Sequence, residues 1–146
     1  MDTDRDAQRT QIARQFIEAI PHSRDLGMEL VEVGEGWVLM AIDYDARFVG
    51  DPETGVLHGG VITALLDTCG GASVMAHPAA PGGTATIDLR IDYMRAAAPG
   101  KRVLARAECY RLTRNVAFVR GFAYTDDIDE PVAAANGAFT VEGGKA

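Results

Sequence analysis

Apolar positions in the first part of the chain fall into segments of different character. Between residues 5 and 20 they recur at helical spacing and Pro21 follows, which predicts an amphipathic helix that ends at this proline. Segments 27–33 and 37–44 are rich in β-forming residues and are separated by a Gly-Glu-Gly turn, which predicts two strands. Residues 45–56 contain two glycines and a proline and predict a loop.

The longest apolar stretch, residues 59–77, predicts a buried helix that ends before Pro78. Strand-like segments separated by turns follow it, and they span residues 84–94, 102–112, 116–125 and 132–141. The first of these alternates cleanly, with Thr86 on the polar face and Ile87 on the apolar face. A sheet with one apolar face needs a cover, and the long apolar helix can supply it. The pattern therefore predicts an α+β fold in which an antiparallel sheet is wrapped around one long central helix, with an extra N-terminal helix.

Length and composition agree with one globular domain. The 146 residues, 47% of them hydrophobic and 24% charged, are enough to form one core. We expect a single domain over residues 1–146, with the N-terminal helix in 1–20 and the core in 25–141. Cys69 and Cys109 have no CxxC or metal-binding spacing, which argues against a disulfide scaffold or a metal site and suits a reducing compartment.

The distribution of charge narrows the classes of function. A net charge of −7 argues against a nucleic-acid partner. Residues 84–120 hold eight basic and three acidic side chains, and this basic segment suits either a solvated strand surface or a phosphorylated small molecule. The polar, acidic N-terminus predicts no signal peptide, and polar residues interrupt the apolar stretch, which argues against a membrane span. We therefore expect a cytoplasmic protein with no membrane partner.

The central helix carries an acid that its own sequence does not neutralise. Asp67 lies in the middle of the apolar stretch, and residues 55–76 contain no Lys or Arg. Small side chains share its stripe at spacings of three and four, at Gly60, Thr63, Gly70 and Gly71. Close helix packing explains Gly70 and Gly71. An unpaired buried carboxylate, however, is costly, and it persists where a ligand or a polar partner approaches it.

The start of this helix indicates a second functional element. His58-Gly59-Gly60 places two residues without side chains in the first turn, where free N–H groups and the helix dipole favour negative charge. Glycine also lets a substrate oxygen approach the backbone. The motif has the outline of an oxyanion site, although a glycine-rich helix start is often only a tight turn.

Geometry separates the acid from the helix start. Gly59 and Asp67 are eight residues apart, or roughly 12 Å along a helix. An attacking group and an oxyanion donor must both lie about 3 Å from one reacting centre, so one chain cannot bring these two together. A two-fold dimer with antiparallel central helices can, and we therefore expect a homodimer with two equivalent sites at its interface.

Two segments of the sequence resemble a known family. GVLHGGVITALLDT (55–68) and TIDLRIDYMRAAAPG (86–100) are similar to the hotdog-fold acyl-CoA thioesterases, in the PaaI-like branch of the 4-hydroxybenzoyl-CoA thioesterase superfamily. The likeness covers residues 25–141. It implies the hotdog fold, dimers that often pair into tetramers, and hydrolysis of an acyl-CoA thioester with no cofactor, since coenzyme A is part of the substrate.

The resemblance also implies roles for individual residues. Asp67 would be the catalytic carboxylate, acting as a general base or as a nucleophile. The Gly59 N–H would polarise the thioester carbonyl, with His58 and Gly60 beside it. Family members place a Ser or Thr near the acid, a position that Thr86 matches, although its alternation puts it on the polar strand face.

Further positions concern substrate binding. Family members often carry an amide side chain before the HGG motif, where this chain has Asp51, which also suits an ordinary turn residue before a proline. The family binds coenzyme A phosphates with Arg or Lys. Arg114 lies in the turn before the penultimate strand, where Thr113 replaces the usual glycine. Arg111 and Arg95 are secondary candidates.

Two other functions on this fold stay open. A non-catalytic acyl-CoA binding or sensing protein would have little reason to keep a carboxylate beside the thioester. An acyl thioester hydratase or dehydratase would pair a His with an acid on a differently patterned helix. The sequence contains no GxSxG, Walker, Rossmann or HExxH motif, and no metal is expected.

Overall fold

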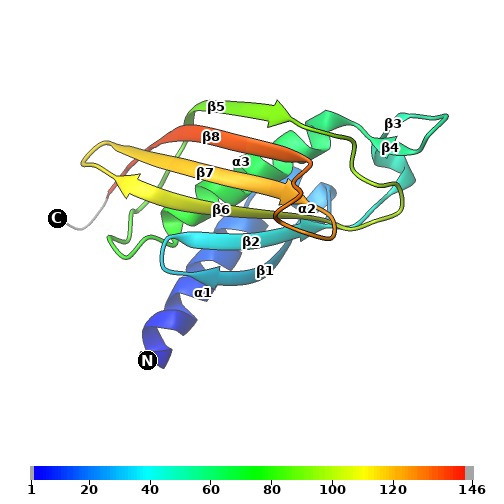
Figure 1. Cartoon of the computed structure of the whole chain (residues 1–146). Coiled ribbons are helices and arrows are strands. Elements are labelled where there is room, and N and C mark those ends of the chain that lie inside the picture. The colour runs from blue at the N-terminus through cyan, green and yellow to red at the C-terminus, as the bar shows by residue number, and fades with distance from the viewer. Residues whose placement is uncertain (1, 144–146) are drawn as a thin grey trace.

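A computed structural model describes residues 2–143 of the chain (Figure 1). Its helical elements are α1 (Thr3–Glu18), α2 (Pro21–Asp25), the 3₁₀ turn η1 (Ala46–Phe48) and α3 (Gly59–Met75). Its strands are β1 (Glu29–Gly34), β2 (Trp37–Ile42), β3 (Val49–Asp51), β4 (Val56–Leu57), β5 (Thr86–Tyr93), β6 (Val103–Leu112), β7 (Val116–Tyr124) and β8 (Ala133–Thr140).

Six strands form one antiparallel sheet in the order β1-β2-β6-β7-β8-β5. The sheet curls around α3, and β3 and β4 form a separate small pair near the start of this helix (Figure 1). The predicted α+β architecture, an antiparallel sheet around one long helix, is therefore confirmed. At one edge β1 packs against α1, whereas no strand within residues 2–143 pairs with the outer edge of β5.

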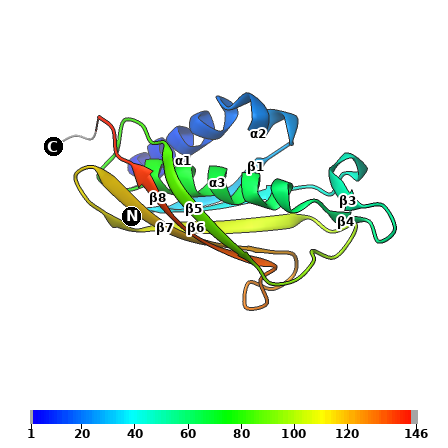
Figure 2. The same ribbon diagram turned by 90° about the horizontal axis from the view of Figure 1, so that it is seen from above.

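The central helix α3 lies between the sheet and the N-terminal helices. Seen from above, α1 and α2 cross the side of α3 that faces away from the sheet (Figure 2). The bulky side of α3 packs on the sheet as predicted, with Ile62, Leu65, Leu66, Cys69 and Ala72 all buried. The Cys69 thiol donates to the carbonyl oxygens of Val38 and Ala105 at 3.3 and 3.4 Å, and burial raises the pKa of this thiol to about 12. Both cysteines are free.

The N-terminal region departs from the predicted single helix. α1 ends at Glu18, and Pro21 begins α2 rather than closing the helical region. Proline is favourable in the first turn of a helix because it has no N–H to leave unpaired there. The predicted loop 45–56 contains η1, β3 and β4, and its Phe48 carbonyl accepts the His58 N–H at 2.8 Å. This bond ties the segment to the start of α3.

A β-bulge in β5 overturns the clean alternation predicted for residues 84–94. The pairing with β8 shifts by one residue between Thr86 and Asp88, so that Thr86 lies opposite Phe139. Residues directly opposite each other share a face of the sheet, and Phe139 is buried against α3. Ile87, in turn, is 57% exposed. The prediction that Thr86 lies on the outer, polar face is therefore wrong, because the bulge turns its side chain toward α3.

Neither a membrane-spanning helix nor a metal-binding cluster occurs in the described part of the chain. Within residues 2–143, no helix combines the length and the apolar character needed to cross a membrane. The same residues hold no group of three side chains suited to binding a metal ion.

Candidate active site

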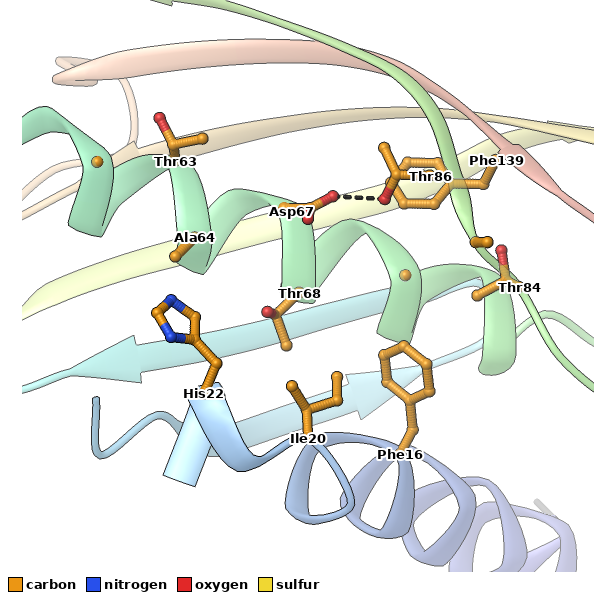
Figure 3. A pocket seen from close by; sticks show the side chains of 13 residues that line it. Phe16, Ile20, His22, Thr63, Ala64, Asp67, Thr68, Thr84, Thr86 and Phe139 are labelled. Atoms are coloured by element: carbon orange, nitrogen blue, oxygen red, sulfur yellow. Dashed lines mark hydrogen bonds between the residues drawn. The ribbon is translucent and has the colours of Figure 1, made fainter. Parts of the chain in front are cut away.

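Asp67 lies in the third turn of α3, on the side that faces α2 and β5 (Figure 3). Its Oδ1 accepts a hydrogen bond from Thr86 Oγ1 at 2.6 Å. This contact joins residues that are 19 positions apart, and it exists because the bulge turns Thr86 inward. The Asp67 side chain is partly buried, and its Oδ2 accepts no hydrogen bond from residues 2–143. That oxygen is available to a water molecule or a substrate.

A cavity of about 350 Å³ lies beside Asp67, between α3 and the N-terminal helices (Figure 3). The apolar part of its lining comes from Phe16, Ile20, Ala64, Gly71 and Phe139. The polar part comes from Asp67, His22 and four threonines, at 63, 68, 84 and 86. No Lys or Arg among the described residues lines this cavity. Asp67 therefore meets a partly apolar space without a strong counter-charge.

A second hollow of about 330 Å³ lies at the start of α3. His22 and Gly60 line both this hollow and the cavity beside Asp67. Arg47 and His58 line only the hollow at the start of α3. The two spaces therefore adjoin along the same side of the helix.

His58 caps the start of α3. Its Nδ1 accepts the Gly60 N–H at 2.8 Å, so this N–H is already bonded within the chain. A Cβ added at Gly60 would lie only 2.8 Å from the same nitrogen. This position therefore requires glycine, because the His58 ring lies too close to the backbone for a side chain. The Gly59 N–H donates to no acceptor among the described residues. Gly59 is therefore the first-turn residue whose N–H can meet a ligand.

Tyr93 is a residue of this site that sequence reasoning missed. Its hydroxyl donates to the Gly59 carbonyl oxygen at 2.8 Å and also contacts Thr63 Oγ1. The tyrosine ring rests on the glycine, because a Cβ added at Gly59 would lie 3.2 Å from a ring carbon. Tyr93 therefore holds the first turn of α3 against β5. In the sequence Tyr93 is an aromatic residue at the end of a predicted strand, within the segment 86–100 that carries the family resemblance, and nothing local assigns it to the helix start.

Asp51 behaves as a turn residue in the described structure. Its carboxylate accepts the Glu53 N–H at 3.0 Å and the Thr54 hydroxyl at 2.8 Å. The Thr54 hydroxyl and the Glu53 N–H hold the pKa of Asp51 below its usual value. The carboxylate is thus occupied by its own loop, and a role in substrate binding stays a prediction.

The three predicted phosphate-binding arginines do not converge within one chain. Arg111 and Arg114 are exposed at the β6–β7 turn, at the end of the sheet opposite to the start of α3 (Figure 1). Arg95 follows β5 near the start of α3, where it lines a small hollow with Gly59 and donates to the Glu130 carbonyl oxygen. The chain therefore brings Asp67 together with Thr86, but it leaves these arginines in two separate places.

The comparison with known sequences points to one family. The family model described as "Thioesterase superfamily" matches residues 54–132, which is more than half of the chain. The match includes α3 and β5, and α1 and α2 lie outside it. The medium/long-chain acyl-CoA thioesterase YigI of Escherichia coli strain K12 is 30% identical over 122 residues, which cover 75% of this chain and 78% of YigI.

Solved structures share the fold. A protein of Pseudomonas aeruginosa is 43% identical to this chain, with a TM-score of 0.82 over 90% of this chain and 98% of that one. The PaaI protein of E. coli, from the phenylacetic acid degradation operon, has a TM-score of 0.84 over 96% of this chain and 97% of its own. Its identity is 18%, so this likeness concerns the fold alone. The hotdog fold expected from the sequence is confirmed.

Proposed function

The chain belongs to the thioesterase superfamily, and we propose that this thioester hydrolase converts an acyl-CoA to a free acid and coenzyme A, with Asp67 as the reacting carboxylate. The observation that carries the proposal is the hydrogen bond from Thr86 to Asp67 at the wall of a cavity. The name of the relative YigI, a medium/long-chain acyl-CoA thioesterase, supports acyl-CoA as the class of substrate.

Asp67 carries out one of two reactions with the thioester. As a general base it takes a proton from a water molecule, whose oxygen attacks the carbonyl carbon. As a nucleophile it attacks that carbon itself and forms an acyl anhydride, which water then hydrolyses. In both routes the C–S bond breaks, and the sulfur leaves with the electron pair and takes up a proton. Thr86 supports either route because it holds Oδ1 and leaves Oδ2 for the reaction.

The Gly59 N–H of a second copy of the chain stabilises the negative oxygen of the tetrahedral intermediate. Within one chain Gly59 and Asp67 are separated by roughly 12 Å of helix, which is too far for one reacting carbon. A two-fold dimer with antiparallel α3 helices places Gly59 of one copy beside Asp67 of the other, and its symmetry creates two equivalent sites. Such dimers can pair further into tetramers.

The free edge of β5 supports this dimer. An unpaired edge strand exposes backbone N–H and C=O groups, and proteins normally cover or block such edges. Large apolar side chains are also exposed at this edge, with Ile87 57%, Met94 56% and Tyr93 50% accessible. A second copy that covers β5 would bury these side chains beside the site. A fully active monomer in sedimentation at the assay concentration would contradict the shared site.

Arg114 binds a phosphate of coenzyme A, with Arg111 as its neighbour on the same turn. Both side chains are exposed and stand at the far end of the sheet from the chain's own Gly59. Antiparallel pairing of two chains brings the far end of one sheet toward the helix start of the other. Arg95 contributes from the end nearer to Gly59.

A panel of acyl-CoA substrates tests the proposal against its two alternatives. Short-chain, medium-chain and aromatic acyl-CoAs are incubated with the purified protein, and free thiol is followed with a chromogenic disulfide reagent. Thiol release is the expected result. Binding of acyl-CoA without thiol release would indicate a binding or sensing protein. Addition of water to an enoyl-CoA without thiol release would indicate a hydratase, and either outcome would overturn the proposal.

A further inference from the structure

The two N-terminal helices lie outside the segment that matches the family model, yet they form one wall of the cavity beside Asp67. Phe16 on α1, Ile20 in the link and His22 on α2 point toward α3 in Figure 3. The same helices cross α3 on the side away from the sheet (Figure 2). This wall of the cavity therefore comes from residues that the family-model match does not include.

The wall contacts α3 directly at two points. The Phe16 ring lies over Gly71, where an added Cβ would meet the ring at 2.9 Å. Ser23 is buried, and its Oγ lies 3.5 Å from Thr68 Oγ1. Phe16 thus closes the cavity at the Gly71 end, and Ser23 holds α2 against α3. Ile20 lies between these contacts and faces the space below Thr68 (Figure 3).

The lining restricts the chemistry of an occupant. Asp67 and His22 are its only titratable side chains among the described residues, and it contains no Lys or Arg. A negatively charged group entering this space would meet the Asp67 carboxylate and find no Lys or Arg to replace its hydration. The volume of about 350 Å³ lies at the lower end of the range for small-molecule sites, about 300–1,000 Å³. These properties fit an uncharged apolar group of moderate size.

We propose that this cavity receives the acyl chain and that α1 and α2 determine which acyl groups the enzyme accepts. The inference rests on the proposed thioesterase function. The thioester carbon lies beside Asp67, and the chain extends under Ile20 toward Phe16. Preferred substrates are uncharged, apolar acyl groups of medium length. Acetyl groups are disfavoured because they are too short to contact the apolar wall, and long chains because they exceed the volume of the cavity. Dicarboxylic acyl groups are disfavoured because they would place a negative charge in it.

Two substitutions alter the wall in opposite directions. Ile20→Trp fills the middle of the cavity, and Phe16→Ala opens its closed end. The kcat/KM is measured with acetyl-, octanoyl-, palmitoyl- and succinyl-CoA. A single methylene in a fitted apolar pocket changes discrimination about 10- to 200-fold. We therefore expect Ile20→Trp to lower the octanoyl-to-acetyl ratio by about tenfold or more, and Phe16→Ala to raise the palmitoyl-to-octanoyl ratio by about as much.

Ile12→Ala is the matched control. Ile12 lies one turn before Phe16 on α1, and it lines a different hollow, near the end of α3. This variant should keep the wild-type ratios. Equal ratios in the control and in both wall variants, or a wild-type preference for succinyl-CoA, would overturn the proposal. If circular dichroism shows that Ile20→Trp does not fold, Ala64→Leu fills the same space from α3 and takes its place.

Binding of S-alkyl-CoA thioethers, which cannot be hydrolysed, separates this inference from the proposed function. Calorimetry should show affinity rising about fourfold per methylene up to octyl in the wild type, with this gain lost in Ile20→Trp. If that pattern appears but no acyl-CoA releases thiol, the proposed hydrolysis is wrong, whereas the proposal that the cavity binds the acyl chain is supported. If acyl-CoA is hydrolysed but the affinity does not depend on alkyl length, the proposed hydrolysis is supported, whereas the proposal that the cavity binds the acyl chain is wrong.

Discussion

The side of α3 that faces the sheet and the side that faces α1 and α2 differ in how tightly they are packed. On the sheet side Leu65 is fully buried, and Gly70 has no room for a Cβ, which would lie 2.9 Å from the Phe139 ring. On the other side Thr63 and Asp67 are only partly buried, and a cavity of about 350 Å³ separates them from the N-terminal helices.

This contrast separates stability from chemistry along one helix. Close packing on the sheet side contributes burial free energy, about 1.5–3 kcal/mol for each large apolar side chain. The open side contributes less burial, but it keeps a carboxylate within reach of a ligand. Substitutions on the two sides should therefore change different measured quantities.

The largest effect is expected for Asp67→Asn on the open side. This change keeps the size of the side chain and removes its charge, so the fold should persist while kcat falls about 10²–10⁴-fold, as for loss of a general base. Thiol release measures kcat, and Asp25→Asn, at an exposed carboxylate of α2, is the matched control. A folded Asp67→Asn protein that hydrolyses acyl-CoA within a few-fold of wild type would assign this carboxylate a structural role.

The counterpart on the sheet side is Leu65→Ala. Truncating a fully buried leucine leaves a cavity, so the free energy of unfolding should fall by about 2–5 kcal/mol. Urea denaturation measures this loss, and Val31→Ala, at an exposed position of β1, should change stability by less than about 0.5 kcal/mol. The kcat per folded molecule should stay near the wild-type value. A loss of kcat as large as that of Asp67→Asn would break the separation of the two sides.

Thr86→Val tests the hydrogen bond that orients the carboxylate. Valine keeps the shape and removes the donor to Asp67, and a hydrogen bond to a charged group is worth about 1.5–3 kcal/mol. We expect kcat to fall about 10- to 100-fold. Thr84→Val is the control, because Thr84 lines the same cavity but donates to the Thr140 carbonyl oxygen instead. Equal kcat values for the two variants would show that the bond to Asp67 has no role in turnover.

The smallest effect is expected for Tyr93→Phe at the start of α3. The substitution removes the neutral hydrogen bond to the Gly59 carbonyl oxygen, worth about 1 kcal/mol, together with the contact to Thr63 Oγ1, and it leaves the ring in place. If this bond positions the Gly59 N–H, kcat should fall a few-fold while KM changes little. Tyr110→Phe, at an exposed tyrosine of β6, is the control. A change confined to KM would instead point to substrate binding.

Much of the framework can be read from local patterns in the sequence. The apolar stretch 59–77 predicts the central helix, and the turn sequences after it predict the bounds of the four later strands to within a few residues. Asp67 is identifiable because an acid in an apolar helix with no Lys or Arg nearby is a local anomaly. These features are properties of contiguous residues, since helical and strand periodicity decide which side chains can share a face.

The contacts that complete the site were decided only by the tertiary structure. Thr86 reaches Asp67 because β5 carries one extra residue in its pairing with β8, and that register depends on the neighbouring strand. Tyr93 reaches Gly59 across 34 positions of sequence, and Ile20 lines the cavity because α2 folds back over α3. Such contacts leave no period in the sequence, because they arise only when distant elements pack together and fix the strand register.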